Sequence, residues 1–122
     1  WKILSKKHAK SLTQRGKMAN NFFLTEPAKL DLKDIWKFIA ESNHNSADKF
    51  MREFAKKFQL LAENPKLGRS RDSYILGMRS FPFKDYIIFY FATENGIEIY
   101  RVIHGARNID DLFDELIEGL KP

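Results

Sequence analysis

Two amphipathic segments separated by only a few polar residues place the strongest constraint on how this chain can fold. The first runs from about residue 27 to residue 41, and its apolar residues recur at helical spacing: Ala28, Leu32, Ile35, Trp36 and Ile39. This pattern predicts a helix with one apolar face. Thr25 is a good N-cap for it, and Glu26 and Pro27 suit a first helical turn.

The second segment has Ser46 as its expected N-cap and ends near Asn64-Pro65. It carries a stripe of the same kind: Ala47, Phe50, Met51, Phe54, Phe58 and Leu61. Helices joined by a turn as short as residues 42–45 lie antiparallel as a hairpin. The two apolar faces together exceed what each helix can bury on the other, so a further layer is required.

That layer is a sheet. After a polar linker, residues 65–77, three β-rich segments follow: Met78–Phe81, Tyr86–Ala92 and Ile97–His104. Asn95-Gly96 between the last two is a strong hairpin signal. The alternation along Ile97–His104 is imperfect, and it leaves open which side chains of this strand face the helices.

A short apolar stretch, Phe22–Leu24, precedes the first helix, and an acidic helix capped by Asn108 follows the last strand. The element order is therefore β-α-α-β-β-β-α. We predict an α+β fold in which a helical hairpin packs on a small antiparallel sheet.

The net charge of +5 is concentrated at the amino end. Residues 1–17 hold six of the 21 Lys and Arg and none of the 16 acidic residues, so residues 18–122 have a net charge of −1. We interpret residues 1–17 as a basic extension (a tag, upstream read-through or a disordered arm) and residues 18–122, beginning at Met18, as the folded domain. A nucleic-acid-binding role based on charge would rest on the extension alone.

Several site classes find little support in this sequence. Cys is absent, which removes disulfides and thiolate metal sites and suits a reducing cytoplasm. The three His are scattered and the six Gly are isolated, so we expect neither a metal site nor a cofactor. No apolar run approaches the ~20 residues that span a bilayer, so we expect no membrane association.

What remains is a polar group on or beside the predicted sheet: Arg79, Tyr86, Arg101, His104 and Arg107. Arg presents a rigid fork to phosphate or carboxylate, and a His can act as acid or base near neutral pH. For each of these residues a purely structural role is the alternative to a functional one. Arg101 can pair with Glu98, Asp110 or Asp111, and His104 can hold the turn before Gly105.

Five segments, taken together and in order, resemble the ParE toxins of the ParE/RelE superfamily. They are residues 24–36, residues 61–69, Gly77-Met78-Arg79-Ser80-Phe81-Pro82, Tyr86-Ile87-Ile88-Phe89-Tyr90 and Ile99-Tyr100-Arg101-Val102-Ile103-His104-Gly105-Ala106-Arg107. The resemblance covers about residues 22–107, and residues 1–17 fall outside it. It implies the toxin half of a type II toxin–antitoxin pair, neutralised by a cognate antitoxin and directed against DNA gyrase, with a possible toxin dimer in the assembly.

The superfamily also contains RelE-like endoribonucleases that cut mRNA on the ribosome. In that alternative Arg79, Tyr86, Arg101, His104 and Arg107 would form the catalytic set, whereas a gyrase inhibitor would use Arg79, Arg101, His104 and Arg107 to contact its target without catalysis. Residues 108–122 hold five acids and one Lys, which would repel an RNA backbone and favours the gyrase reading. A third alternative is an inactive relative that only binds antitoxin.

Overall fold

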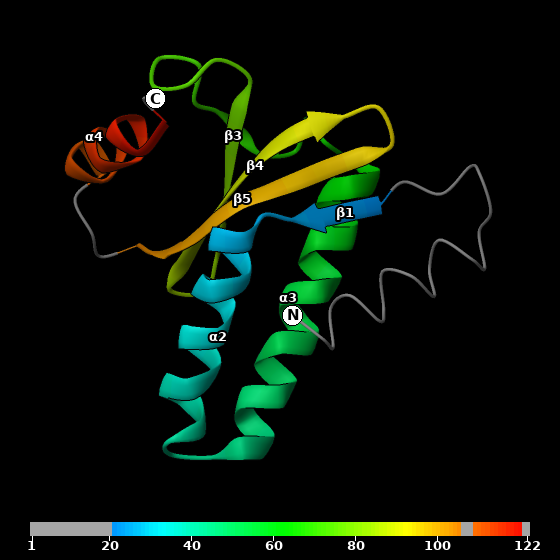
Figure 1. Cartoon of the computed structure of the whole chain (residues 1–122). Helices are drawn as coiled ribbons and strands as arrows, with labels where there is room; N and C mark the ends of the chain where they lie inside the picture. Colours follow the sequence, from blue (N-terminus) through cyan, green and yellow to red (C-terminus); the bar gives the residue numbers. More distant parts are fainter. Residues whose placement is uncertain (1–20, 106–108, 121–122) are drawn as a thin grey trace.

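The computed structural model describes residues 21–105 and 109–120, which form a sheet with helices on both faces (Figure 1). The elements in chain order are β1 (Asn21–Leu24), α2 (Glu26–Ala40), α3 (His44–Glu63), β2 (Arg69–Ser70), β3 (Met78–Phe83), β4 (Tyr86–Thr93), β5 (Gly96–His104) and α4 (Ile109–Leu120). The predicted α+β fold is confirmed. The proposed extension, residues 1–17, lies outside the described residues.

The two helices of the hairpin begin at side-chain caps. Thr25 caps α2 as predicted, because its Oγ1 accepts a hydrogen bond from the Ala28 amide at 3.1 Å. The cap of α3 is Asn43 and not Ser46. Asn43 has an extended backbone, and its side chain accepts from the Ser46 amide at 3.0 Å, so the helix starts before Ser46 and uses that residue as a donor.

The sheet has the strand order β1-β5-β4-β3-β2, with all neighbours antiparallel except β1 and β5. The parallel pairing of β1 makes the sheet mixed, and β2 adds an edge strand within the linker that the sequence did not indicate. Gly96 allows β1 to approach, since its φ is 144° and a Cβ there would overlap the Asn21 carbonyl.

A β-bulge in β5 explains the imperfect alternation of its sequence. Phe89 pairs with Arg101 and Tyr90 pairs with Ile99, so Tyr100 is an extra residue without a partner across the ladder. Ile97 and Ile99 face the helical hairpin before the bulge, and Val102 does so after it. The inward parity therefore changes at Tyr100.

Each face of the sheet has its own core. The hairpin covers one face, where Leu32, Phe54 and Phe58 of the helices pack with Ile88 and Tyr90 of β4. The other face is covered by α4, whose Leu112 and Phe113 pack on Met78, Phe89 and Ile103. The Phe113 ring also stacks on Tyr74 at 4.0 Å between centroids. Helices therefore cover at least part of each face of the sheet. No described helix is both long and apolar enough to cross a membrane.

The buried Tyr90 hydroxyl ties the start of the linker to the sheet. It accepts a hydrogen bond from the Gly68 amide and donates one to the Pro65 carbonyl, both at 2.8 Å. Burial raises the pKa of this phenol. A Cβ on residue 68 would clash with the Tyr90 side chain and the Ser80 carbonyl, which favours glycine there.

Replacing Tyr90 by Phe tests this anchor. The change leaves one buried donor and one acceptor without partners, so we expect the free energy of unfolding to fall by about 1–3 kcal/mol. Chemical denaturation of both proteins measures the difference. Tyr100→Phe is the matched control, because the half-buried Tyr100 hydroxyl makes no hydrogen bond within the described residues; an equal loss there would contradict the assignment.

Candidate functional site

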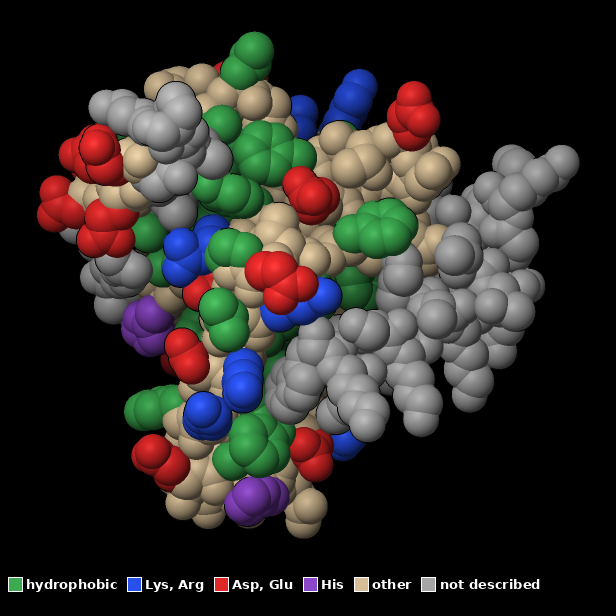
Figure 2. Space-filling view, in the orientation of Figure 1, with side chains coloured by type: hydrophobic (Ala, Val, Ile, Leu, Met, Phe, Trp, Pro, Cys, Tyr) green, Lys and Arg blue, Asp and Glu red, His purple; other side chains and the backbone are tan. Residues whose placement is uncertain are grey.

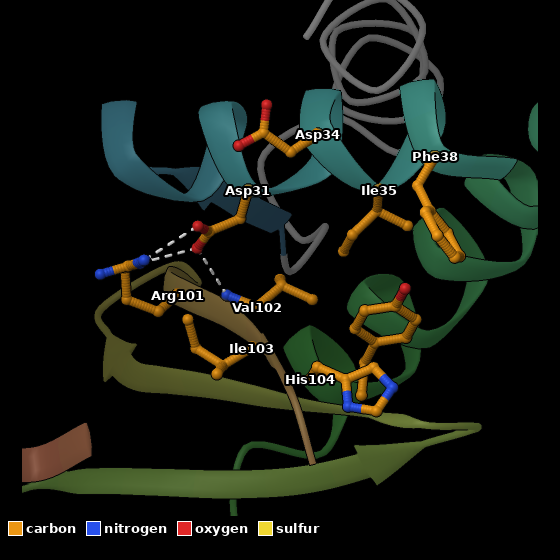
Figure 3. Close-up of a pocket in the computed structure, with 9 residues that line it drawn as sticks. Asp31, Asp34, Ile35, Phe38, Arg101, Val102, Ile103 and His104 are labelled. Carbon is orange, nitrogen blue, oxygen red and sulfur yellow. Dashed lines mark hydrogen bonds and ion pairs between the residues drawn. The ribbon is translucent and has the colours of Figure 1, made fainter. Parts of the chain in front are cut away.

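A shallow groove of about 370 Å³ lies between α2 and the end of β5 (Figure 3). Asp31, Asp34, Ile35 and Phe38 line it from the helix, and β4 and β5 supply the remaining residues: Tyr86, Arg101, Val102, Ile103 and His104. Three of the five residues that the sequence singled out therefore meet in one place, namely Tyr86, Arg101 and His104.

A two-pronged ion pair between Arg101 and Asp31 forms one end of the groove. Arg101 donates from Nε to Asp31 Oδ2 at 2.7 Å and from a terminal nitrogen to Oδ1 at 2.9 Å. The Asp31 Oδ2 atom also accepts from the Val102 amide at 3.0 Å. The hydrogen bonds to Asp31 raise the pKa of Arg101 above its ordinary value, so this guanidinium is a fixed cation whose fork is already filled.

The position of Asp31 follows from the way α2 leaves the sheet. β1 ends at Leu24, opposite Ile99, so the edge of β5 beyond that point has no neighbouring strand. The Thr25 amide donates to the Ile99 carbonyl at 3.1 Å, and the Thr25 hydroxyl donates to the Tyr100 carbonyl at 2.8 Å. α2 thus begins against this edge, and its second turn delivers Asp31 to the Val102 amide.

The predicted partners of Arg101 were therefore wrong: Asp31 takes the place of Glu98, Asp110 and Asp111. Asp31 lies 70 residues away in the sequence, and no local spacing signals such a pair.

The other end of the groove is aromatic and open. Phe38 is 70% exposed, and His104 is exposed beside it. The Tyr86 ring meets His104 edge to face at 5.3 Å and also contacts Phe50 at 5.9 Å. Burial raises the pKa of Tyr86 above its ordinary value, which disfavours its phenolate form.

Arg79 stands apart from this groove. It lies on β3, and one terminal nitrogen donates to the Gly68 carbonyl at 2.7 Å and to the Lys66 carbonyl at 3.4 Å. Its role is to hold the linker against the sheet. Arg107 lies outside the described residues, so the predicted five-residue group is brought together only in part.

The polar contacts on the α4 face were not indicated by the sequence. Arg71 donates from Nε to the buried Ser80 hydroxyl at 2.7 Å, and Tyr74 donates to Asp110 of α4 at 2.6 Å. Burial and the neighbouring Arg69 lower the pKa of Arg71, and the hydrogen bond to Asp110 raises that of Tyr74. Arg71 and Tyr74 come from the linker, whose only sequence signal was polarity. No group of three His, Asp or Glu in the described part of the chain could hold a metal ion.

Comparison with known proteins identifies the family. Residues 22–109 match the family described as ParE toxin of type II toxin-antitoxin system, parDE. The chain belongs to the ParE toxin family. The resemblance predicted from the sequence is thereby confirmed, and the matched region contains the whole hairpin, the sheet except Asn21, and the groove.

Individual relatives agree with this family. Toxin ParE1 of Mycobacterium tuberculosis, in strains CDC 1551 and H37Rv, is 27% identical over 95 residues, which cover 76% of this chain and 97% of the relative. Among solved structures, a chain of the chromosomal ParDE TA system from P. aeruginosa superposes with a TM-score of 0.59 and 18% identity. The match covers 73% of the present chain and 98% of that chain, and it supports the ParE fold.

The Asp31–Arg101 pair is expected to stabilise this ParE-family domain. Asp31→Ala leaves a partly buried guanidinium and the Val102 amide without their acceptor, so we expect a loss of about 2–3 kcal/mol in the free energy of unfolding. Arg101→Met and the double variant complete a thermodynamic cycle, in which the double variant should lose less than the sum of the single ones. Asp34→Ala, an exposed acid on the same helix, is the control. Strictly additive losses would show that the two side chains do not stabilise each other.

Proposed function

We propose that this chain is a growth-arresting toxin that inhibits DNA gyrase in the bacterial cytoplasm and is neutralised by a cognate antitoxin. Membership of the family described as the toxin of a toxin–antitoxin system supports the general role. The matched solved structure comes from a ParDE TA system, which supports an antitoxin as partner. A toxin dimer within such an assembly is part of the same proposal.

One observation favours gyrase inhibition over a RelE-type endoribonuclease: Arg79 and Arg101 already make contacts within the domain. Arg101 directs its Nε atom and one terminal nitrogen at Asp31, and Arg79 directs one terminal nitrogen at backbone carbonyls. A phosphodiester that bound through the same nitrogens would compete with these contacts. Tyr86 and His104 lie at the open end of the groove, and among the described residues that line it the cation of Arg101 is paired with Asp31.

The charge of the second face points the same way. Its covering helix α4 holds five acids and no base: Asp110, Asp111, Asp114, Glu115 and Glu118. Figure 2 shows acidic side chains gathered over this helix. A polyanion approaching the sheet from this side would meet like charge, whereas a protein target would not be repelled in the same way.

We assign target contact to the open end of the groove, with Phe38 as its apolar anchor and His104 beside it. A large aromatic side chain that is 70% exposed next to a concave surface is typical of a residue that becomes buried in a complex. In this view Arg79 and Arg101 position the surface and do not themselves touch the target.

Purified gyrase provides the decisive experiment. The chain should inhibit supercoiling of relaxed plasmid, and expression in a bacterial host should arrest growth with a DNA-damage response and intact mRNA. Co-expression of a cognate antitoxin should relieve the arrest. Cleaved mRNA with unaffected supercoiling would instead establish the endoribonuclease. Tight binding of an antitoxin without any arrest would establish an inactive relative that only binds antitoxin.

Phe38→Ala should weaken gyrase inhibition by about tenfold, because an anchor residue of this kind contributes on the order of 1–2 kcal/mol to a complex. Supercoiling assays across a toxin titration measure the shift. Leu30→Ala is the matched control, since Leu30 is also exposed on α2, at 60%, but lies outside the groove. Both variants remove solvent-facing side chains and should fold as the parent does. Equal inhibition by the Phe38 variant and the parent would exclude this surface.

A further inference from the structure

A second pocket, of about 340 Å³, lies between α3 and the turn that joins β3 to β4. Its lining combines three lysines, one acid and two apolar side chains: Lys56, Lys57, Lys84, Glu53, Leu60 and Phe83. None of these residues lines the groove beside α2. Because four of them recur on α3 at helical spacing, one stripe of the helix forms a wall of the pocket.

Lys84 is held in place at the cost of backbone strain. It occupies the two-residue loop between Phe83 and Tyr86 with φ of 53°, a conformation that favours glycine. Its Nζ atom lies 2.8 Å from Glu53 Oε2 and 5.0 Å from the centre of the Phe50 ring. This contact with Lys84 lowers the pKa of Glu53. A strained lysine fixed by two contacts points to a role beyond closing the turn.

Lys56 and Lys57 have charges that are still available. Neither makes an ion pair within the described residues, and Lys57 instead lies 5.9 Å from the centre of the Phe83 ring. Glu53, the only acid in the lining, is already engaged by Lys84. Beside these cations Leu60 is 37% exposed, so the pocket offers positive charge around an apolar surface.

We propose that this pocket binds an acidic peptide segment of a partner protein, with carboxylates on Lys56 and Lys57 and an apolar side chain on Leu60 and Phe83. Charge complementarity favours this occupant, since Lys56 and Lys57, which make no ion pair among the described residues, flank an apolar floor. The inference concerns a surface distinct from the groove and does not rest on gyrase inhibition.

Two features favour a peptide bound through its side chains over other ligands. Glu53 places a carboxylate among the lysines, which would repel a continuous phosphate backbone but leaves room for discrete acidic side chains. The adjoining stretch of β3, beyond its pairing with β2, contains Pro82, which has no amide to donate to an added strand. Pairing of the partner as an extra strand is therefore disfavoured here.

The test uses the purified full chain and a fluorescent synthetic helical peptide with Glu and Leu at a spacing of three and four residues. Comparison probes are a scrambled peptide of the same composition and a single-stranded oligonucleotide of equal charge. Fluorescence anisotropy at low and at physiological ionic strength gives the affinities. We expect the patterned peptide to bind more tightly than either comparison probe.

Two sets of variants locate the binding. Lys56→Glu with Lys57→Glu should weaken peptide binding by about tenfold or more. The matched control is Lys33→Glu with Lys37→Glu, which reverses the charge of two exposed lysines on α2, outside the pocket, and should leave binding intact. Lys84→Gly removes a cation while supplying the residue that the positive φ favours, so it should retain its fold and also bind more weakly, because Glu53 then faces the peptide unpaired.

Each contrary outcome overturns the proposal. Binding that is absent, or that survives all pocket variants, removes the site. If the α2 control weakens peptide binding as much as the pocket variants do, the lysines attract anions in general and do not form a specific site. The same holds if the scrambled peptide and the oligonucleotide bind as tightly as the patterned peptide. Supercoiling assays on the same variants separate this result from the gyrase proposal, because peptide binding and gyrase inhibition can be lost independently.

Discussion

The three hydrogen bonds that converge on the Asp31 carboxylate connect the two layers of this fold. They join the second turn of α2 to the unpaired edge of β5, where β1 no longer covers the strand. The edge amide would otherwise face solvent or a foreign strand, a hazard that folded proteins avoid by capping or covering their edges. By fixing α2 against β5, the same carboxylate also sets the width of the groove and the placement of Phe38 above His104 (Figure 3).

The helices and most strands were predictable because their signals are local. Helical periodicity located α2 and α3, and Thr25 indicated where α2 begins. The start of α3 was misplaced because Asn43 and Ser46 are both good caps, and only the backbone conformation at Asn43 decides between them. The bulge at Tyr100 was unpredictable for a related reason, since register belongs to a pair of strands and not to one sequence.

The sequence predicted several of the residues that line the site but not the contacts that these residues make. Tyr86, Arg101 and His104 do share a groove, as residues near one end of two paired strands must. The assignment of Arg101 to an acid on β5 or α4 failed because its partner arrives on a helix from the far end of the domain. The cationic pocket on α3 escaped notice because Lys84 reaches it through a turn, and in sequence it is one lysine among many. The two cases share a cause: the role of a charged side chain depends on which residues lie next to it, and only the fold determines those neighbours.

The parallel pairing of β1 with β5 has a consequence for how the chain is made. The paired residues Asn21 of β1 and Gly96 of β5 are about 75 residues apart in the sequence. During synthesis β1 therefore leaves the ribosome well before β5, and it cannot pair until β5 has emerged. Until β5 emerges, the hairpin has no finished sheet to cover, and its Phe-rich face remains without its final layer. The groove likewise needs both α2 and β5, so it forms only when synthesis of the domain is nearly complete. A partial translation product of this toxin family therefore lacks the assembled surface, and a partner that recognises the groove binds only finished chains.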